Sequence, residues 1–239
     1  MPGKSQRTGS LRCGCPYAAL AIGKETEMGI HSGSQKILDL GKENLKRQKL
    51  YKESMGNFYM VIDTRPYMRA MQYYFELLES CCMIQQAITV AREMLKLNRN
   101  DNQGIRFYLM ALHVYSEDEF NASKLIQENK GEENRCFFAM SMALLKFRQG
   151  KWKEAQVILE RLKTQYNGFQ NFLRDAAAGG NVFYEGANMN YYQPFTRSEL
   201  ITMVLDFHFL WDGAQEFFHW AKTVMSPAKK RRGKKNSAE

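Results

Sequence analysis

The sequence predicts an all-α protein in which helical hairpins repeat and stack as an α-solenoid. Good helix formers such as Met, Leu, Glu and Lys are plentiful, and only 5 of the 239 residues are proline. The hydrophobic content of 44% is enough for a sizeable core. A helix–turn–helix pattern then recurs along the middle of the chain, and its spacing carries most of the prediction.

The clearest hairpins are two helices at 66–80 and 85–97, and a second pair within 136–166. Pro66 suits the first turn of a helix, where its missing N–H costs nothing. Ala87 and Ala155 occupy the same place in their hairpins and lie 68 residues apart, while Ala122 falls one residue from the midpoint. A period of 34 residues is the tetratricopeptide signature, in which small residues let two helices approach closely. The predicted repeats are 68–101, 102–135 and 136–169, and Asp101 can cap the helix that follows it.

The flanks of this array complete the domain plan. Residues 1–32 are predicted to be a disordered basic arm, and 33–227 a single helical domain that starts with a short helix at 34–53. Residues 56–64 are expected to form an extended, buried lead-in, and residues 175–196 a loop. Thr196 and Glu199 frame a capping box that opens a capping helix pair at 197–225. Residues 228–239 form a basic, disordered tail.

The net charge of +9 belongs to the flanks and not to the folded part. Residues 1–52 carry +6, residues 228–239 carry +5, and the middle carries −2. The tail cations can serve as a nuclear-import signal, as a contact to nucleic acid, or only as a solubilising tail. These cations are Lys229, Lys230, Arg231, Arg232, Lys234 and Lys235. We expect an intracellular protein, nuclear or nucleocytoplasmic, without a membrane partner, because no run of 18 apolar residues is present.

No group of residues suggests chemistry, so we expect a protein that is not an enzyme and that needs no cofactor. The five cysteines make no paired C-x₂-C frame, and we expect no metal site. No phosphate-binding glycine loop of the G-x₄-G-K-[ST] type occurs. His208 and His219 are expected on different helices, where packing is a better explanation than a shared ligand.

Binding is therefore the expected activity, and the repeat frame indicates which residues line a groove. The first helix of each repeat faces the groove in tetratricopeptide arrays, and the set is mixed polar and apolar, as suits a peptide or helix. The expected groove residues are Arg69, Gln72, Glu76, Arg106, Met110, His113 and Met140. An alternative stays open for the third repeat, where Phe137, Met140 and Leu144 can be packing residues covered by the C-terminal helices.

Two stretches, "GNFYMVIDTRPYMRA" and "REMLKLNRNDNQGIRFYLMALHV", resemble segments of a family of tetratricopeptide-like proteins. This family comprises the suppressor-of-tumorigenicity-type proteins with their bacterial relatives and fungal, MYND-associated relatives. The resemblance covers roughly residues 55–220. It implies an all-α fold and a non-enzymatic interaction role. The chain lacks a MYND-like cysteine set and membrane helices, so the relatives' location does not transfer.

The leading hypothesis is a scaffold that binds a protein partner in its groove. The alternative is an RNA- or ribosome-associated protein. Its basic termini would grip phosphates, and Tyr73, Phe107 and Tyr108 would stack on bases. The near-neutral middle of the chain argues against this alternative.

Overall fold

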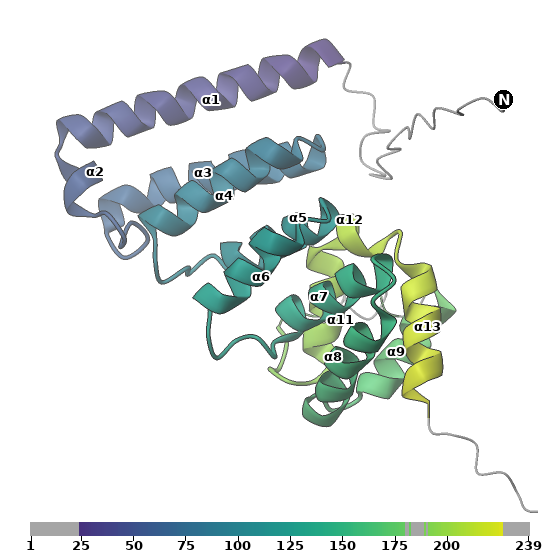
Figure 1. Cartoon of the computed structure of the whole chain (residues 1–239). Helices are drawn as coiled ribbons and strands as arrows, with labels where there is room; N and C mark the ends of the chain where they lie inside the picture. Colours follow the sequence, from purple (N-terminus) through teal and green to yellow (C-terminus); the bar gives the residue numbers. More distant parts are fainter. Residues whose placement is uncertain (1–23, 180–181, 183–188, 190, 227–239) are drawn as a thin grey trace, which may run out of the picture. The chain divides into compact units, whose positions relative to one another are not determined.

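A computed structural model describes residues 24–179, 182, 189 and 191–226, with side chains described from residue 32 onward. Helices account for the regular structure of these residues, and none of them forms a β-strand (Figure 1). The predicted all-α class is confirmed. The chain divides into two compact units, Met1–Leu125 and Ile126–Glu239, where the sequence predicted one helical domain.

Unit 1 begins with a long helix and continues with two short elements and three further helices. In chain order these are α1 (Lys24–Arg47), α2 (Leu50–Glu53), the 3₁₀ helix η2 (Ile62–Thr64), α3 (Arg65–Ser80), α4 (Ile84–Leu97) and α5 (Ile105–Tyr115). The boundary between the units falls within α6 (Glu119–Glu128). Helix α1 begins at Lys24, so residues 24–32, which were expected to belong to a disordered arm, are helical.

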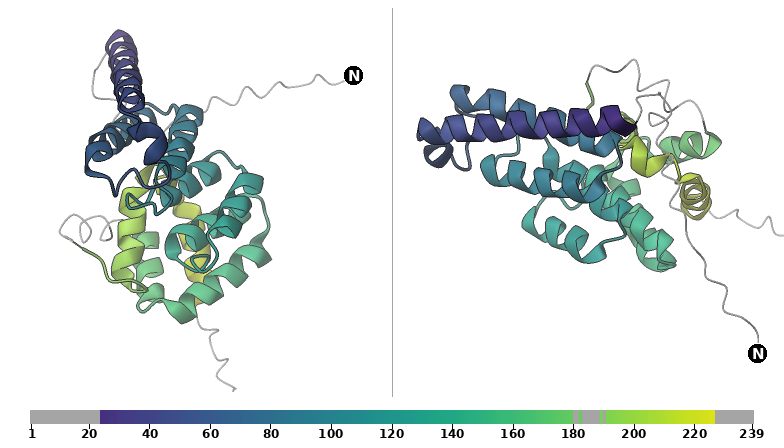
Figure 2. Two further views of the ribbon diagram at one scale, coloured as in Figure 1. Left: turned by 90° about the vertical axis from the view of Figure 1, so that its left-hand side faces the viewer. Right: turned by 90° about the horizontal axis from the view of Figure 1, so that it is seen from above.

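The α3/α4 hairpin forms the centre of unit 1, as its apolar spacing predicted. Met68, Phe75 and Leu78 of α3 are buried against α4, whose Ala87 and Met94 are buried in turn. Helix α1 lies along α3 in both views (Figures 1 and 2). Pro66 lies in the first turn of α3, and α3 ends at Ser80, both as expected.

The lead-in to α3 is only partly the buried segment that was expected. Phe58 is fully buried, and its N–H donates to the Leu97 carbonyl over 3.1 Å. The Thr64 hydroxyl, also buried, donates to the Phe58 carbonyl over 2.5 Å. Met60 and Ile62, in contrast, are exposed. The segment is therefore a rigid turn with an apolar outer edge.

Unit 2 is built around one helix that is buried on every side. Its helices are α7 (Cys136–Arg148), α8 (Trp152–Gln165), α9 (Phe169–Ala178), α11 (Arg197–Asp206), α12 (His208–Trp211) and α13 (Gln215–Met225). Every residue of 136–145 in α7 is buried, because α8 and α11 both pack on it. Helix α13 packs on α9 and α8. The predicted C-terminal helices are present, with a break at Phe207 that separates α11 from α12.

Helix α9 is the main element that the sequence did not predict. It begins after Gly168, whose left-handed φ of 80° ends the preceding turn, and it extends through residues expected to be the start of a loop. Phe169, Phe172 and Leu173 give it a buried face. Phe183 and Tyr184 of the expected loop lie outside the described residues.

Candidate partner-binding surface

The outer face of α3 carries the exposed part of the expected groove. Arg69, Tyr73 and Glu76 follow each other at intervals of four and three residues, so they lie on one face of the helix. All three are exposed, and 71% of Tyr73 is accessible to solvent. The opposite face of α3 is the one buried in unit 1. An exposed cation, aromatic ring and carboxylate therefore form one surface, which we call the α3 face.

A row of side-chain amides extends the α3 face toward α5. Gln103 donates to the Gln72 side-chain oxygen over 2.6 Å and lies 3.4 Å from the Met68 carbonyl oxygen. Gln72 donates in turn to the Glu76 carboxylate over 3.0 Å. Gln72 and Glu76, both expected in the groove, are thus joined to the loop before α5. Because these hydrogen bonds already fix the side chains, a partner that binds here would pay a smaller cost in conformational entropy.

Arg106, another expected groove residue, is held by an internal ion pair. Its guanidinium lies 2.9 Å from the Asp101 carboxylate and stacks on the Phe107 ring at 4.4 Å. The same carboxylate accepts the backbone N–H groups of Ile105 and Arg106, at 2.8 and 3.0 Å. Asp101 therefore caps the first two N–H groups of α5 with its carboxylate, as predicted, although Gly104 occupies the N-cap position itself. Burial raises the pKa of Asp101, although these donors oppose the rise.

The prediction that they line an open groove is wrong for three of the seven expected residues, because these side chains are buried. Met110 of α5 and Met140 of α7 are fully buried, and His113 of α5 is 2% exposed. Phe137 and Leu144 are buried as well. Phe137 packs edge-on against Phe207, with 5.7 Å between ring centroids. The third repeat thus follows the alternative in which C-terminal helices cover these side chains.

The aromatic residues considered for base stacking differ in their accessibility. Tyr108 packs edge-on against Phe75, with 5.6 Å between ring centroids, and Phe107 lies beneath the Arg106 guanidinium. Tyr73 alone among the three has a mostly exposed ring. A stacking platform of three successive rings is not assembled in this surface.

Unit 2 contains a buried ionic network that sequence reasoning missed. Glu199 at the start of α11 is fully buried, and one of its carboxylate oxygens pairs with the Arg135 guanidinium. The other oxygen accepts the Tyr166 hydroxyl at 3.0 Å and the Phe195 N–H at 2.7 Å. The Thr196 hydroxyl caps the helix as predicted, by accepting the Ser198 N–H. The acidic member of the expected capping box instead joins α11 to the segment before α7 and to the end of α8.

Cys136 lies beside this network and is a packing residue. Its backbone N–H donates to the Tyr166 hydroxyl over 2.8 Å, and the residue is fully buried. Burial raises the pKa of the Cys136 thiol well above its ordinary value. The thiol is therefore protonated at neutral pH, which removes the nucleophilic form.

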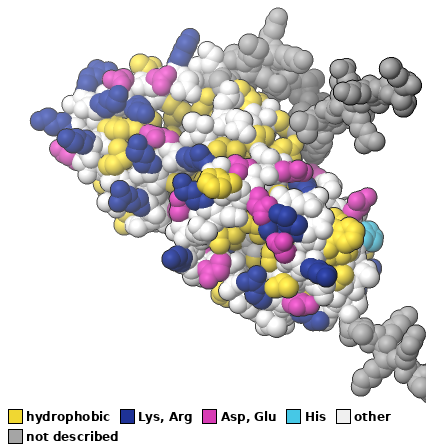
Figure 3. Space-filling model, viewed as in Figure 1, with side chains coloured by type: hydrophobic (Ala, Val, Ile, Leu, Met, Phe, Trp, Pro, Cys, Tyr) yellow, Lys and Arg dark blue, Asp and Glu magenta, His cyan; other side chains and the backbone are white. Residues whose placement is uncertain are grey.

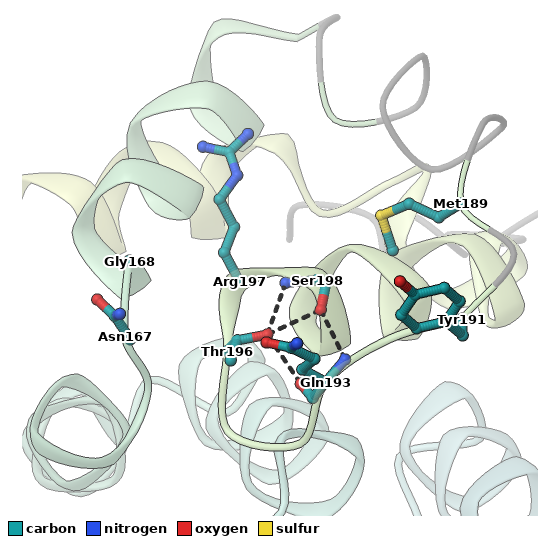
Figure 4. Close-up of a pocket in the computed structure, with 8 residues that line it drawn as sticks. All are labelled: Asn167, Gly168, Met189, Tyr191, Gln193, Thr196, Arg197 and Ser198. Carbon is teal, nitrogen blue, oxygen red and sulfur yellow. Dashed lines mark hydrogen bonds between the residues drawn. The ribbon is translucent and has the colours of Figure 1, made fainter.

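A hollow of about 640 Å³ lies at the start of α11 (Figure 4). Its polar groups already bind one another: Ser198 accepts the Gln193 N–H at 2.9 Å, and the Thr196 and Ser198 hydroxyls are 2.7 Å apart. The Arg197 guanidinium is directed away, to Asp175 of α9 at 2.6 Å. Residues 183–188 and 190, next to Met189 in its wall, lie outside the described part, and we assign no ligand to it.

The described residues bear on the predictions for a metal site and a membrane span, but not on the prediction for the basic tail. Within that part of the chain, no three His, Cys, Asp or Glu side chains gather as a metal ion would need. No described helix has both the length and the apolar composition of a membrane span. The basic tail, from Lys229 to Lys235, lies outside the described residues.

Comparison of the chain with protein-family models, with curated proteins and with solved structures found no match. The resemblance to suppressor-of-tumorigenicity-type proteins therefore stays a prediction from the quoted segments.

Proposed function

We propose that this protein is a non-enzymatic scaffold and that a partner peptide or helix binds its α3 face. The observation that carries the proposal is the exposure of Tyr73 between Arg69 and Glu76. Tyr and Arg dominate the binding energy of many protein interfaces, because they combine apolar area with a polar group. No hydrogen bond or ion pair within the described residues engages the Arg69 side chain, so its charge is available to a partner.

The proposal includes a tetratricopeptide-like character for the helical hairpins. Ala87, Ala122 and Ala155, which the 34-residue period singled out, are all fully buried, in α4, α6 and α8. The period is irregular, since α3, α5 and α7 begin at residues 65, 105 and 136, which are intervals of 40 and 31 residues. An experimental structure that places the three hairpins in one superhelix would test this part of the proposal.

The binding experiment compares two sets of substitutions with the same helical spacing. The test variant carries Arg69→Ala, Tyr73→Ala and Glu76→Ala. The control carries Lys153→Ala, Val157→Ala and Glu160→Ala on the exposed face of α8 in unit 2. Partners are captured from cell extract with the full chain, identified, purified and then titrated against each variant. Captured RNA is identified in parallel.

We expect the test variant to bind the purified partner at least about 30-fold more weakly, the usual loss when a hot spot is truncated. The control should bind like the original chain. Equal affinity of both variants would overturn the proposal. Captured material that is mainly RNA, and that is lost when the tail cations are replaced by Gln, would move the function to the basic termini.

We also propose nuclear or nucleocytoplasmic location through the basic tail. Six cations within residues 229–235 fit an import signal. A fluorescent fusion in which these six residues are replaced by Gln should lose nuclear accumulation. An unchanged distribution would contradict the proposal without affecting the α3 face.

A further inference from the structure

One end of unit 1 gathers exposed cations around the turn that joins α1 to α2 and around the end of α4. These residues, which we call the basic end, are Arg47, Lys49, Lys52, Lys96 and Arg99. All are exposed, and none of them forms an ion pair with another described residue. Figure 3 shows several Lys and Arg side chains at this end, at the left of the view, with hydrophobic and some acidic side chains between them.

The turn before α3 adds an apolar tip to the same end. Met60 is 56% exposed and Ile62 is 75% exposed, although both are large apolar side chains. Backbone bonds tie this turn to the end of α4: the Arg99 N–H donates to the Gly56 carbonyl over 2.8 Å, and the Phe58 N–H donates to Leu97. The apolar tip and the cations therefore belong to one rigid surface.

The turn is also held from its other side. Arg65 donates from Nε to the Tyr59 carbonyl over 2.7 Å, and the Thr64 hydroxyl donates to Phe58. The exposure of the tip is thus a property of an ordered turn, and folding leaves Met60 and Ile62 in water. Met60 and Ile62 therefore give the basic end an apolar tip that stays exposed in the folded chain.

The charge of the basic end selects an anionic partner. Glu43, Glu53 and Asp63 are the exposed acids beside the five cations. Because Glu43 pairs with Lys46 at 2.7 Å, the local balance is positive. Nucleic acid would bind the cations through its phosphates, but it offers no apolar interior that Met60 and Ile62 could enter. Met60 and Ile62 project from the turn beside the cations, which suits entry into the boundary of the acyl chains below anionic headgroups.

We propose that the basic end and its apolar tip dock on the surface of an anionic lipid bilayer. The cations would lie at the level of the headgroups, and Met60 and Ile62 would enter the boundary of the acyl chains, as in other peripheral contacts. The expectation of no membrane partner rested on the absence of a spanning segment, and a surface contact needs no such segment. This proposal does not rest on the α3 face, which lies on different residues.

Binding of the full chain to vesicles tests the proposal. Vesicles of phosphatidylcholine alone are compared with vesicles that contain about 30 mol% phosphatidylserine, whose negative surface attracts clustered cations. The cation variant carries Lys49→Gln, Lys52→Gln and Arg99→Gln, and the tip variant carries Met60→Ser and Ile62→Ser. All chains are also prepared with the six tail cations replaced by Gln, so that the tail cannot supply the binding.

Matched controls come from similarly exposed residues elsewhere. Ile37→Ser with Leu40→Ser removes two apolar side chains that are 65% and 68% exposed on α1. Lys153→Gln, Arg161→Gln and Lys222→Gln removes three exposed cations of unit 2. Circular dichroism confirms that each variant is folded.

We expect binding to the anionic vesicles only. The cation variant should bind roughly 100-fold more weakly, at about fivefold for each cation near an anionic surface. The tip variant should lose about tenfold or more, because two apolar side chains no longer leave water. Both controls should bind like the original chain.

Several results would overturn the proposal. These are the absence of vesicle binding once the tail is neutralised, a tip variant that binds like the original chain, and controls that lose as much as the test variants. If the cation variant lost binding to a single-stranded RNA probe but bound vesicles like the original chain, the basic end would be assigned to nucleic acid.

Discussion

Replacement of Glu199 by Gln should destabilise unit 2 by about 3–5 kcal/mol, the usual cost of breaking a buried ion pair from one side. The carboxylate accepts hydrogen bonds on both oxygens, from Arg135 on one and from Tyr166 and Phe195 on the other. A carboxamide of the same shape offers one acceptor oxygen. Its NH₂ group must then face a donor, whichever way the side chain is turned.

The structure indicates how much each donor of the Glu199 carboxylate contributes to this loss of stability. Glu199 is fully buried, while the Arg135 side chain is 20% exposed, so water can relieve only part of the unpaired charge. An orphaned buried donor costs about 1–3 kcal/mol, and the charge of Arg135 adds to that cost. The Phe195 N–H lies nearer the surface and contributes less, since Phe195 itself is 44% exposed.

The assay is urea unfolding of the full chain, followed by a probe of unit 2 such as fluorescence of its Trp residues. Glu154→Gln is the matched control, because Glu154 pairs with Lys146 at 2.7 Å but is 57% exposed. A pair of that kind contributes less than about 1 kcal/mol. If Glu199→Gln cost no more than the control, the network would not hold α7, α8 and α11 together, and the reasoning would fail.

Three further outcomes are expected. Ala155→Leu should cost about 1–3 kcal/mol of unfolding free energy by overpacking, while Ala178→Leu at an exposed site stays within about 0.5 kcal/mol; equal effects would refute close helix contact at Ala155. Burial lowers the pKa of His113, so the unfolded chain binds the extra proton and stability is lost as pH falls below about 6.5, at up to about 1.4 kcal/mol per pH unit. Unfolding from pH 7.5 to 5 should show a shallower slope for His113→Gln, and an unchanged slope would contradict this. Gly150→Ala should cost about 1 kcal/mol of unfolding free energy, because residue 150 has a left-handed φ. Gly168→Ala should cost more, because φ is left-handed there as well and the new Cβ would lie 3.2 Å from the Arg197 side chain. Equal shifts of the two urea midpoints would count against the close approach of Arg197 to residue 168.

Local signals in the sequence were enough to predict most helices of the two units. Pro66 marks the start of α3, Asp101 caps α5, and Thr196 caps α11, because each of these effects depends on residues within one helical turn. Helix α9 escaped prediction because its residues run into a stretch of Ala and Gly that is typical of a loop. Its helical state depends on a buried face that packs on α13.

The candidate surface was predicted less well than the helices. Arg69 and Glu76 are exposed and Gln72 is half-buried, because α3 has one apolar side and one polar side; their role in binding stays a prediction. The spacing rule that selected these residues was wrong for Met110 and Met140. Helices α5 and α7 are apolar on most sides, so their periodicity does not distinguish a groove from the core.

The sequence by itself determined the all-α class, the α3/α4 and α7/α8 hairpins and the burial of Ala87, Ala122 and Ala155, since these follow from propensity and spacing along the chain. The tertiary structure alone decided that α7 is covered on every side and that Glu199 meets Arg135 across 64 residues of sequence. It also decided that Met60 and Ile62 stay in water. The physical reason is that burial depends on which distant elements pack over a side chain, and the local sequence does not specify those elements.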